Sequence, residues 1–221
     1  MLVISPDNNS EPIWFNVSKW RISVLKNPPP TLHDVLTLNA SNDNKYLAIL
    51  SVGEGHPVID IILVSDVLSD LKPSFSYSLD PYPGDVTIVE WNAHALHVKS
   101  DMLLTHRIND GRVPGALMLF SAESFVLDVE TGKIEPISES LKDPIAYYGN
   151  HLLETPDEYS PVTELSAMDV LNGKEAIPYL QTALKRKRYI KYQADIIEVI
   201  ERLKKSYNKP SSADAKSSAA D

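Results

Sequence analysis

Two histidines near the middle of the chain have the type and spacing that could support acid–base or metal chemistry. His94 and His97 are three residues apart, and Asp85, Glu90 and Asp101 lie close to them in sequence. An imidazole beside a carboxylate can act as a general base or as a metal ligand. A hydrolase that uses His94 or His97 with Asp85 or Asp101 is therefore one hypothesis for the function.

Strand geometry and composition oppose a metal site at these histidines. Residues three apart on a strand point to opposite faces, so both rings reach one ion only across a turn or bulge. The chain has no cysteine, which removes thiolate ligands and thiol nucleophiles. It also has no Walker loop, Gly-x-Ser-x-Gly elbow or dinucleotide-binding fingerprint. We expect no metal and no cofactor, and surface histidines in turns are the alternative interpretation.

A basic run near the C-terminus is the second candidate. It comprises Lys185, Arg186, Lys187, Arg188 and Lys191. Tyr189 and Tyr192 flank these cations and could stack on bases, so a nucleic-acid-associated protein is another hypothesis. The alternative is a solvated helix surface that lies partly against acidic parts of the chain.

Aromatic residues are concentrated near the N-terminus. Trp14, Phe15 and Trp20 lie within seven positions, and tryptophan is enriched in binding hot spots. Trp14 and Trp20 are therefore candidate interaction residues, whereas filling of a core or sheet edge is the alternative role.

The charge of the chain is distributed unevenly. Residues 1–173 carry 10 basic and 24 acidic side chains, a formal charge of -14, whereas residues 174–209 carry a charge of +6. An acidic surface repels phosphate and attracts basic proteins. We therefore expect a non-catalytic protein-binding module, of the adaptor, inhibitor or immunity type, that presents an acidic β surface to a protein partner. Nucleic acid is not the expected partner.

Short apolar runs between turn residues predict an antiparallel β body over residues 1–140. In chain order, the predicted strands are Ile13 to Val17, Arg21 to Leu25, Val35 to Leu38, Tyr46 to Val52, Val58 to Val64, Val86 to Trp91, Ala95 to Val98, Ala116 to Phe120, Phe125 to Val129 and Ile134 to Ile137.

Two segments of about 20 residues in total resemble the hairpins of a β-propeller blade. Asn39 to Ala48 is similar to an inner hairpin, and Phe125 to Ile134 is similar to an outer one. A propeller closes with about four or more four-stranded blades, and this chain supplies two or three. The resemblance therefore implies blade-like sheets that pack as a sandwich or an open β-structure.

The remainder of the chain predicts a linker and helices over residues 141–207, followed by a disordered tail over 208–221. A short helix is expected from Thr163 to Leu171, ended by Asn172 and Gly173. One long amphipathic helix is expected from about Pro178 to Lys205. Self-association through this C-terminal helix is a further hypothesis.

The expected class is thus mainly β (α+β), with antiparallel blade-like or sandwich sheets followed by a C-terminal helical segment. The first residues do not resemble a secretory signal, and no apolar run approaches the roughly 20 residues of a membrane span, so we expect neither in this chain. We expect a cytoplasmic protein without membrane contact.

Overall fold

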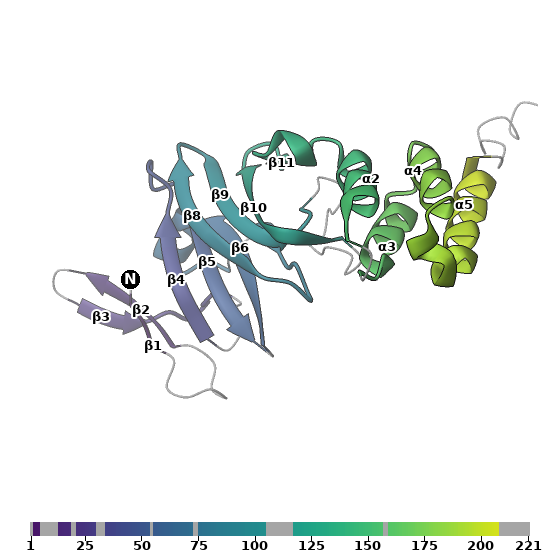
Figure 1. Ribbon diagram of the computed structural model, residues 1–221. Coiled ribbons are helices and arrows are strands. Elements are labelled where there is room, and N and C mark those ends of the chain that lie inside the picture. The colour runs from purple at the N-terminus through teal and green to yellow at the C-terminus, as the bar shows by residue number, and fades with distance from the viewer. Residues whose placement is uncertain are drawn as a thin grey trace, which may run out of the picture. The chain divides into compact units, whose positions relative to one another are not determined.

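The chain divides into two compact units, residues 1–138 and 139–221. We call them the β unit and the helical unit, and Figure 1 shows their elements. The computed structural model describes residues 2–4, 13–18, 21–29, 34–53, 55–72, 75–104, 117–156 and 159–207. Trp20 and the expected tail over 208–221 lie outside these residues.

A small antiparallel sheet opens the β unit. Its strands are β1 (Leu2–Ile4), β2 (Ile13–Ser18) and β3 (Arg21–Val24), paired in chain order. Both strands predicted between residues 13 and 25 are confirmed. Leu25, directly after β3, is buried and belongs to the core of the next sheet.

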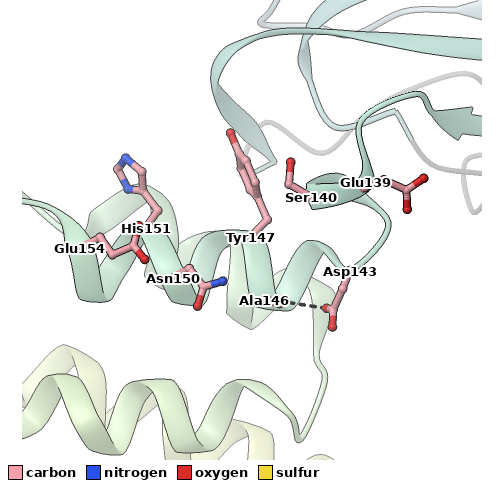
Figure 2. Close-up of a pocket in the computed structure, with 8 residues that line it drawn as sticks. All are labelled: Glu139, Ser140, Asp143, Ala146, Tyr147, Asn150, His151 and Glu154. Carbon is pink, nitrogen blue, oxygen red and sulfur yellow. Dashed lines mark hydrogen bonds between the residues drawn. The ribbon is translucent and has the colours of Figure 1, made fainter.

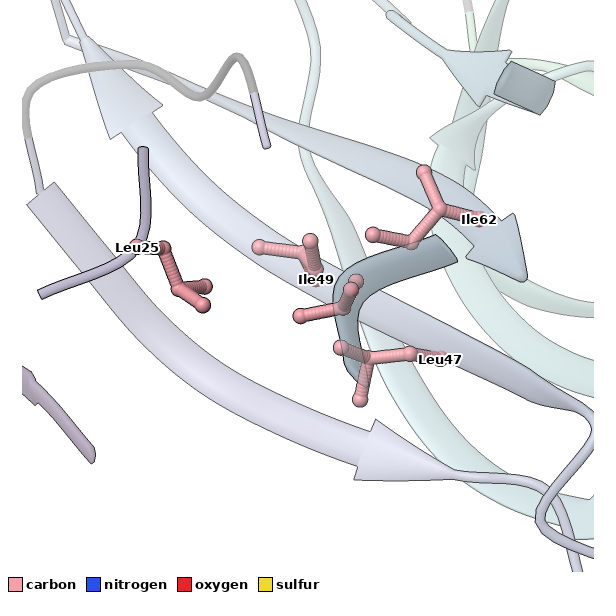
Figure 3. Packing of buried hydrophobic residues seen from close by; sticks show 5 residues of the cluster. Leu25, Leu47, Ile49 and Ile62 are labelled. Carbon is pink, nitrogen blue, oxygen red and sulfur yellow. The ribbon is translucent and has the colours of Figure 1, made fainter. Parts of the chain in front are cut away.

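The first four-stranded sheet contains β4 (Asp34–Ala40), β5 (Tyr46–Gly53), β6 (His56–Leu63) and β7 (Phe75–Leu79), again in chain order. The sequence predicted the first three strands, but not β7 or the short helix α1 (Val64–Leu68). Strand β5 is buried along nearly its whole length. One face carries Leu47 and Ile49, which pack with Ile62, Val67 and Leu25 in the cluster shown in Figure 3.

The second four-stranded sheet is also an up-and-down meander. It contains β8 (Val86–Asn92), β9 (Ala95–Met102), β10 (Met118–Asp128) and β11 (Ile134–Pro136). One face is buried, because Leu96, Val98, Phe125 and Leu127 point inward, whereas their neighbours in sequence are partly or fully exposed. This alternation is typical of an antiparallel sheet with one face in water.

Trp91 connects the two four-stranded sheets. Its ring is buried and stacks on Tyr46, with 6.4 Å between the ring centroids. Its Nε1 donates a hydrogen bond of 3.0 Å to the carbonyl of Asn39, at the end of β4. The strands β4 and β8, each the first of its sheet, are therefore held together at their C-terminal ends.

A bulge interrupts each of these first strands. Val35 and Thr37 pair with consecutive residues of β5, so Leu36 is the extra residue. Ile88 and Glu90 likewise pair with consecutive residues of β9, so Val89 is the extra residue in β8. Both are largely exposed, at 60% for Leu36 and 55% for Val89.

The described residues of the helical unit begin with the 3-10 turn η1 (Glu139–Leu141) and form four α-helices. They are α2 (Pro144–Glu154), α3 (Val162–Leu171), α4 (Ala176–Leu184) and α5 (Gln193–Tyr207). A second 3-10 segment, η2 (Lys187–Tyr192), joins α4 to α5. The predicted helix near Thr163 is confirmed, and Asn172 ends it in the left-handed conformation with φ 50°.

The structure corrects one of the helix predictions. The single helix expected from Pro178 to Lys205 is wrong, because the chain breaks at Lys185 and Arg186 between α4 and η2. Of the apolar residues in this segment, Ile196 and Leu203 are buried and Leu184 is half-buried. The helix α2 was not among the predicted helices; Asp143 caps it, and Pro144 occupies its first turn.

The observed fold is an α+β structure of antiparallel sheets followed by C-terminal helices, as the sequence predicted. In the part of the chain that the structure describes, no helix is long and apolar enough to cross a membrane.

Candidate functional site

His94 and His97 each lie near a carboxylate, although not those that the hydrolase hypothesis named. His94 follows Ala93 in the β8–β9 turn, and its Nε2 is 3.8 Å from Oδ2 of Asp128. His97 is opposite Glu90 across the strands, and its Nδ1 is 3.7 Å from Oε1 of that residue. The two histidines thus lie beside two different carboxylates.

Asp85 and Asp101 lie at the other end of β8 and β9. The backbone amide of Asp85 donates a hydrogen bond of 2.7 Å to Oδ1 of Asp101. Four residues along β9 separate Asp101 from His97, a distance of about 13 Å at the rise of a strand. The described contacts do not gather the four proposed residues into one site. Among the described residues, no cluster of three or more histidines and carboxylates is placed to hold a metal ion.

The structure places Trp14 in β2, where its backbone is opposite Val3 of β1. Trp20 lies outside the described residues. The roles of Trp14 and Trp20 as interaction residues therefore stay predictions.

The basic run contains two kinds of residue. Nη2 of Arg188 donates to the carbonyls of Leu152 and Leu153, at 2.8 and 3.0 Å, and Arg186 also donates to Leu153. The hydroxyl of Tyr189 donates to Leu152 at 2.6 Å. These carbonyls lie in the last turn of α2, where no intrahelical donor reaches them. Arg186 and Arg188 therefore hold η2 against the end of α2.

The lysines of the run point into water instead. Lys185, Lys187 and Lys191 are exposed, and no ion pair joins them to a described carboxylate. Nζ of Lys191 lies 4.9 Å from the centroid of the Tyr192 ring. These three lysines are the part of the run that a partner could contact.

A buried histidine–glutamate pair that the sequence did not suggest joins α2 to α3. Nδ1 of His151 lies 2.6 Å from Oε1 of Glu164. The side chain of Glu164 is fully buried, whereas that of His151 is 31% exposed. The hydroxyl of Thr155 is 3.1 Å from the same ring nitrogen, and Tyr159 packs edge-on against the ring. A carboxylate on Nδ1 fixes the orientation of an imidazole, as it does in general bases.

The other oxygen of this carboxylate is unusual. Oε2 of Glu164 is buried and has no hydrogen-bond partner among the described residues. The nearby hydroxyl of Tyr148 is buried too, and this burial raises the pKa of Tyr148 above its ordinary value. Because both groups are buried, replacing either should destabilise the helical unit.

His151 also lines a pocket of about 360 Å³ along one side of α2. Figure 2 shows Tyr147 and His151 projecting from the same side of this helix. Carboxylates of Glu139, Asp143 and Glu154 line the pocket as well. Asp143 is committed to the helix cap, where its Oδ1 accepts from the Ala146 amide at 3.0 Å.

A second buried carboxylate lies in the β unit, on strand β6. Asp60 is 8% exposed, and its cross-strand neighbour is Ser78 of β7. Burial raises the pKa of Asp60 to about 6, and the nearby Asp80 also raises it, while a hydrogen bond to Ser78 lowers it. Nε2 of His56 lies 3.5 Å from Oδ1 of Asp80. The group therefore titrates closer to neutral pH than an ordinary aspartate.

Three acidic side chains lie on the open face of the second sheet. A cross-strand row runs from Glu90 through His97 and Val126 to Glu135. The side chains of Glu90 and Glu135 are 67% and 61% exposed. Asp128 lies two residues after Val126 in β10, with its side chain 34% exposed. We call Glu90, Asp128 and Glu135 the acidic face.

Comparison with known proteins adds no relative: no family model, curated protein or solved structure matches this chain.

Proposed function

We propose that the protein is a non-catalytic protein-binding module whose acidic face binds a basic partner protein. The observation that carries this proposal is the open side of the second sheet, where Glu90, Asp128 and Glu135 face water. The β unit as a whole carries 17 acidic and 9 basic residues, a formal charge of -8. Such a field accelerates encounters with a cationic surface.

The internal ion pairs of this face leave it available to a partner. Nζ of Lys133 is 2.7 Å from Oε1 of Glu135, and both side chains are more than 60% exposed. Exposed pairs of this kind contribute little to stability, because water screens them and the long side chains lose entropy. A basic partner can therefore replace the intramolecular cation at small cost.

The geometry favours recognition by side chains over addition of a strand. Strands β4 and β8 lie at the edges of their sheets, and bulges interrupt both. A bulge disrupts the regular row of donors and acceptors that an incoming strand would need. The open face offers no such obstacle to side-chain contacts.

Capture from a native lysate at two salt concentrations, followed by mass spectrometry, tests the proposal. We expect a basic protein to be retained by the parent chain and lost when Glu90 and Glu135 are both changed to Lys. Reversing two exposed acids of the helical unit, Glu175 and Glu198, makes the same change in net charge and should leave capture intact. Equal capture by both variants would refute the acidic face as the binding surface.

Two further sets of variants distinguish the two competing functions. A hydrolase that works through His94 or His97 should lose turnover, not partner capture, when both are changed to Ala. A nucleic-acid-associated protein should instead lose binding when Lys185, Lys187 and Lys191 are neutralised, and its binding should weaken steeply with salt. The binding-module proposal expects partner capture to survive both sets of changes. We also expect the complex to form in the cytoplasm.

A further inference from the structure

An exposed apolar stripe runs along η2 and the first half of α5. Ile190 is 64% exposed and Ile197 is 46% exposed, although each is a large aliphatic side chain. Ala194 lies between them and is exposed as well. The opposite side of the helix is buried, with Ile196, Val199 and Leu203 inside the unit. The stripe is therefore a second apolar side of a helix whose first apolar side is already packed.

Exposed lysines lie at one end of this stripe and exposed glutamates at the other, where Glu198 also pairs with Arg202 of its own helix at 3.7 Å. Lys187 and Lys191 are exposed at its N-terminal end, and Glu198 and Glu201 are exposed at its C-terminal end. Lys187 and Glu201 are each seven residues from Ala194, on either side of it. When two copies of this segment run in opposite directions, the lysines of one copy can therefore lie opposite the glutamates of the other.

We propose that this stripe is the contact surface of a two-fold symmetric dimer, in which η2 and α5 of two copies pack antiparallel across Ala194. A two-fold axis at that residue brings Lys187 of each copy opposite Glu201 of the other. Lys191 then lies beside the other copy's Glu198. The small side chain of Ala194 allows close approach of the helices at the crossing point.

The small apolar contact area predicts a weak, reversible dimer. The contact covers two isoleucines and one alanine per copy, and exposed ion pairs add orientation more than affinity. A parallel arrangement is disfavoured, because it would place the lysines of one copy against the lysines of the other. The proposal concerns the helical unit and does not depend on the acidic face of the β unit.

Sedimentation velocity of the full chain over a range of concentrations tests this dimer. We expect a concentration-dependent monomer–dimer equilibrium. Lys187→Glu and Glu201→Lys should each weaken association by about tenfold, because each replaces two attractions by two repulsions. Replacing Ile190 and Ile197 by Ser should leave only the monomer. Because all these side chains are exposed, circular dichroism should match the parent.

Charge restoration gives the decisive comparison. A mixture of the Lys187→Glu and Glu201→Lys variants should form a heterodimer as tight as the parent dimer, since every cross-copy pair is then attractive. The variant with both changes should also recover parental association. Lys72→Glu, an exposed change in the β unit, should have no effect. A chain that stays monomeric, or a dimer that ignores Lys187→Glu, would overturn the proposal.

Discussion

Oε1 of Glu164 lies 2.6 Å from Nδ1 of His151, and this contact links α3 to α2 inside the helical unit. The side chain of Glu164 is fully buried, and a buried polar group needs a hydrogen-bond partner. Arg188 and Asp70 make contacts of the same kind, in which one polar side chain joins two segments of the chain.

Removing Glu164 should destabilise the helical unit. We expect Glu164→Ala to lower the free energy of unfolding by about 3 kcal/mol, because the change breaks a buried pair and leaves a cavity. Urea unfolding followed by circular dichroism measures this loss. Glu154→Ala, at an exposed carboxylate of α2, is the control and should stay within about 0.5 kcal/mol of the parent. Similar losses in both variants would contradict the structural role of the pair.

Arg188 should matter more to stability than the neighbouring Lys187. Arg188→Ala removes two hydrogen bonds to carbonyls of α2 and should cost about 1 to 3 kcal/mol. Arg188→Lys should recover little, because an ammonium group lacks the planar fork of donors. Lys187→Ala should leave the denaturation midpoint unchanged. If the two alanine variants unfold alike, the arginine does not cap α2.

The carboxylate of Asp70 should protect two backbone amides of the N-terminal segment from hydrogen exchange. It accepts from the amides of Lys26 at 2.8 Å and Asn27 at 2.9 Å, and these bonds lower the pKa of Asp70. Asp70→Ala should therefore speed exchange at both amides. Asp70→Asn should speed it less, since asparagine tolerates the left-handed conformation, with φ 51°, and keeps one acceptor. Unchanged exchange in Asp70→Ala would contradict the assignment.

Asp60 should make the β unit less stable as pH rises. Its pKa is about 6 in the folded chain and about 3.9 when unfolded, so the folded state binds its proton more tightly. Stability from this group is therefore present below about pH 4 and is lost as pH rises to about 6. Asp60→Asn should remove this pH dependence and raise the free energy of unfolding at pH 7 by about 2 to 3 kcal/mol.

Urea titrations at pH 4.5 and pH 7 measure the effect, and Asp85→Asn, at an exposed aspartate, is the control. Asp80 and His56 lie at the same end of β6 and β7, and the Asp60→Asn change leaves both residues in the chain. If Asp60→Asn and Asp85→Asn show the same pH dependence as the parent, the carboxyl of Asp60 is not desolvated.

Local patterns predicted the elements whose side chains alternate clearly or end in strong turn residues. Tyr46 to Val52 and Val58 to Val64 were recognised as strands because they are rich in Leu, Ile and Val. Asn172 was recognised as a helix end because asparagine readily adopts the left-handed conformation. These features depend on neighbours in sequence and need no tertiary information.

Other features depend on contacts between distant residues, and the sequence did not reveal them. The start of α2 at Asp143 and Pro144 was not predicted. The chain breaks near Arg186, whose guanidinium donates to a carbonyl of α2 some 33 residues earlier. Glu164 was not singled out in the sequence, and only the packing of α2 on α3 shows that it is buried. Acidic residues are common in the first turn of a helix. The position of Glu164 in the sequence therefore did not indicate its pairing with His151.

The bulges at Leu36 and Val89 bear on how this chain behaves in a crowded solution. A long, regular and apolar edge invites further strands, and growth of that kind leads to fibres. In the edge strands β4 and β8, the largely exposed apolar residue is the extra residue of the bulge. An incoming strand would meet this side chain only where the backbone is out of register. We therefore expect Leu36 and Val89 to face water at high protein concentration without recruiting a further strand to β4 or β8.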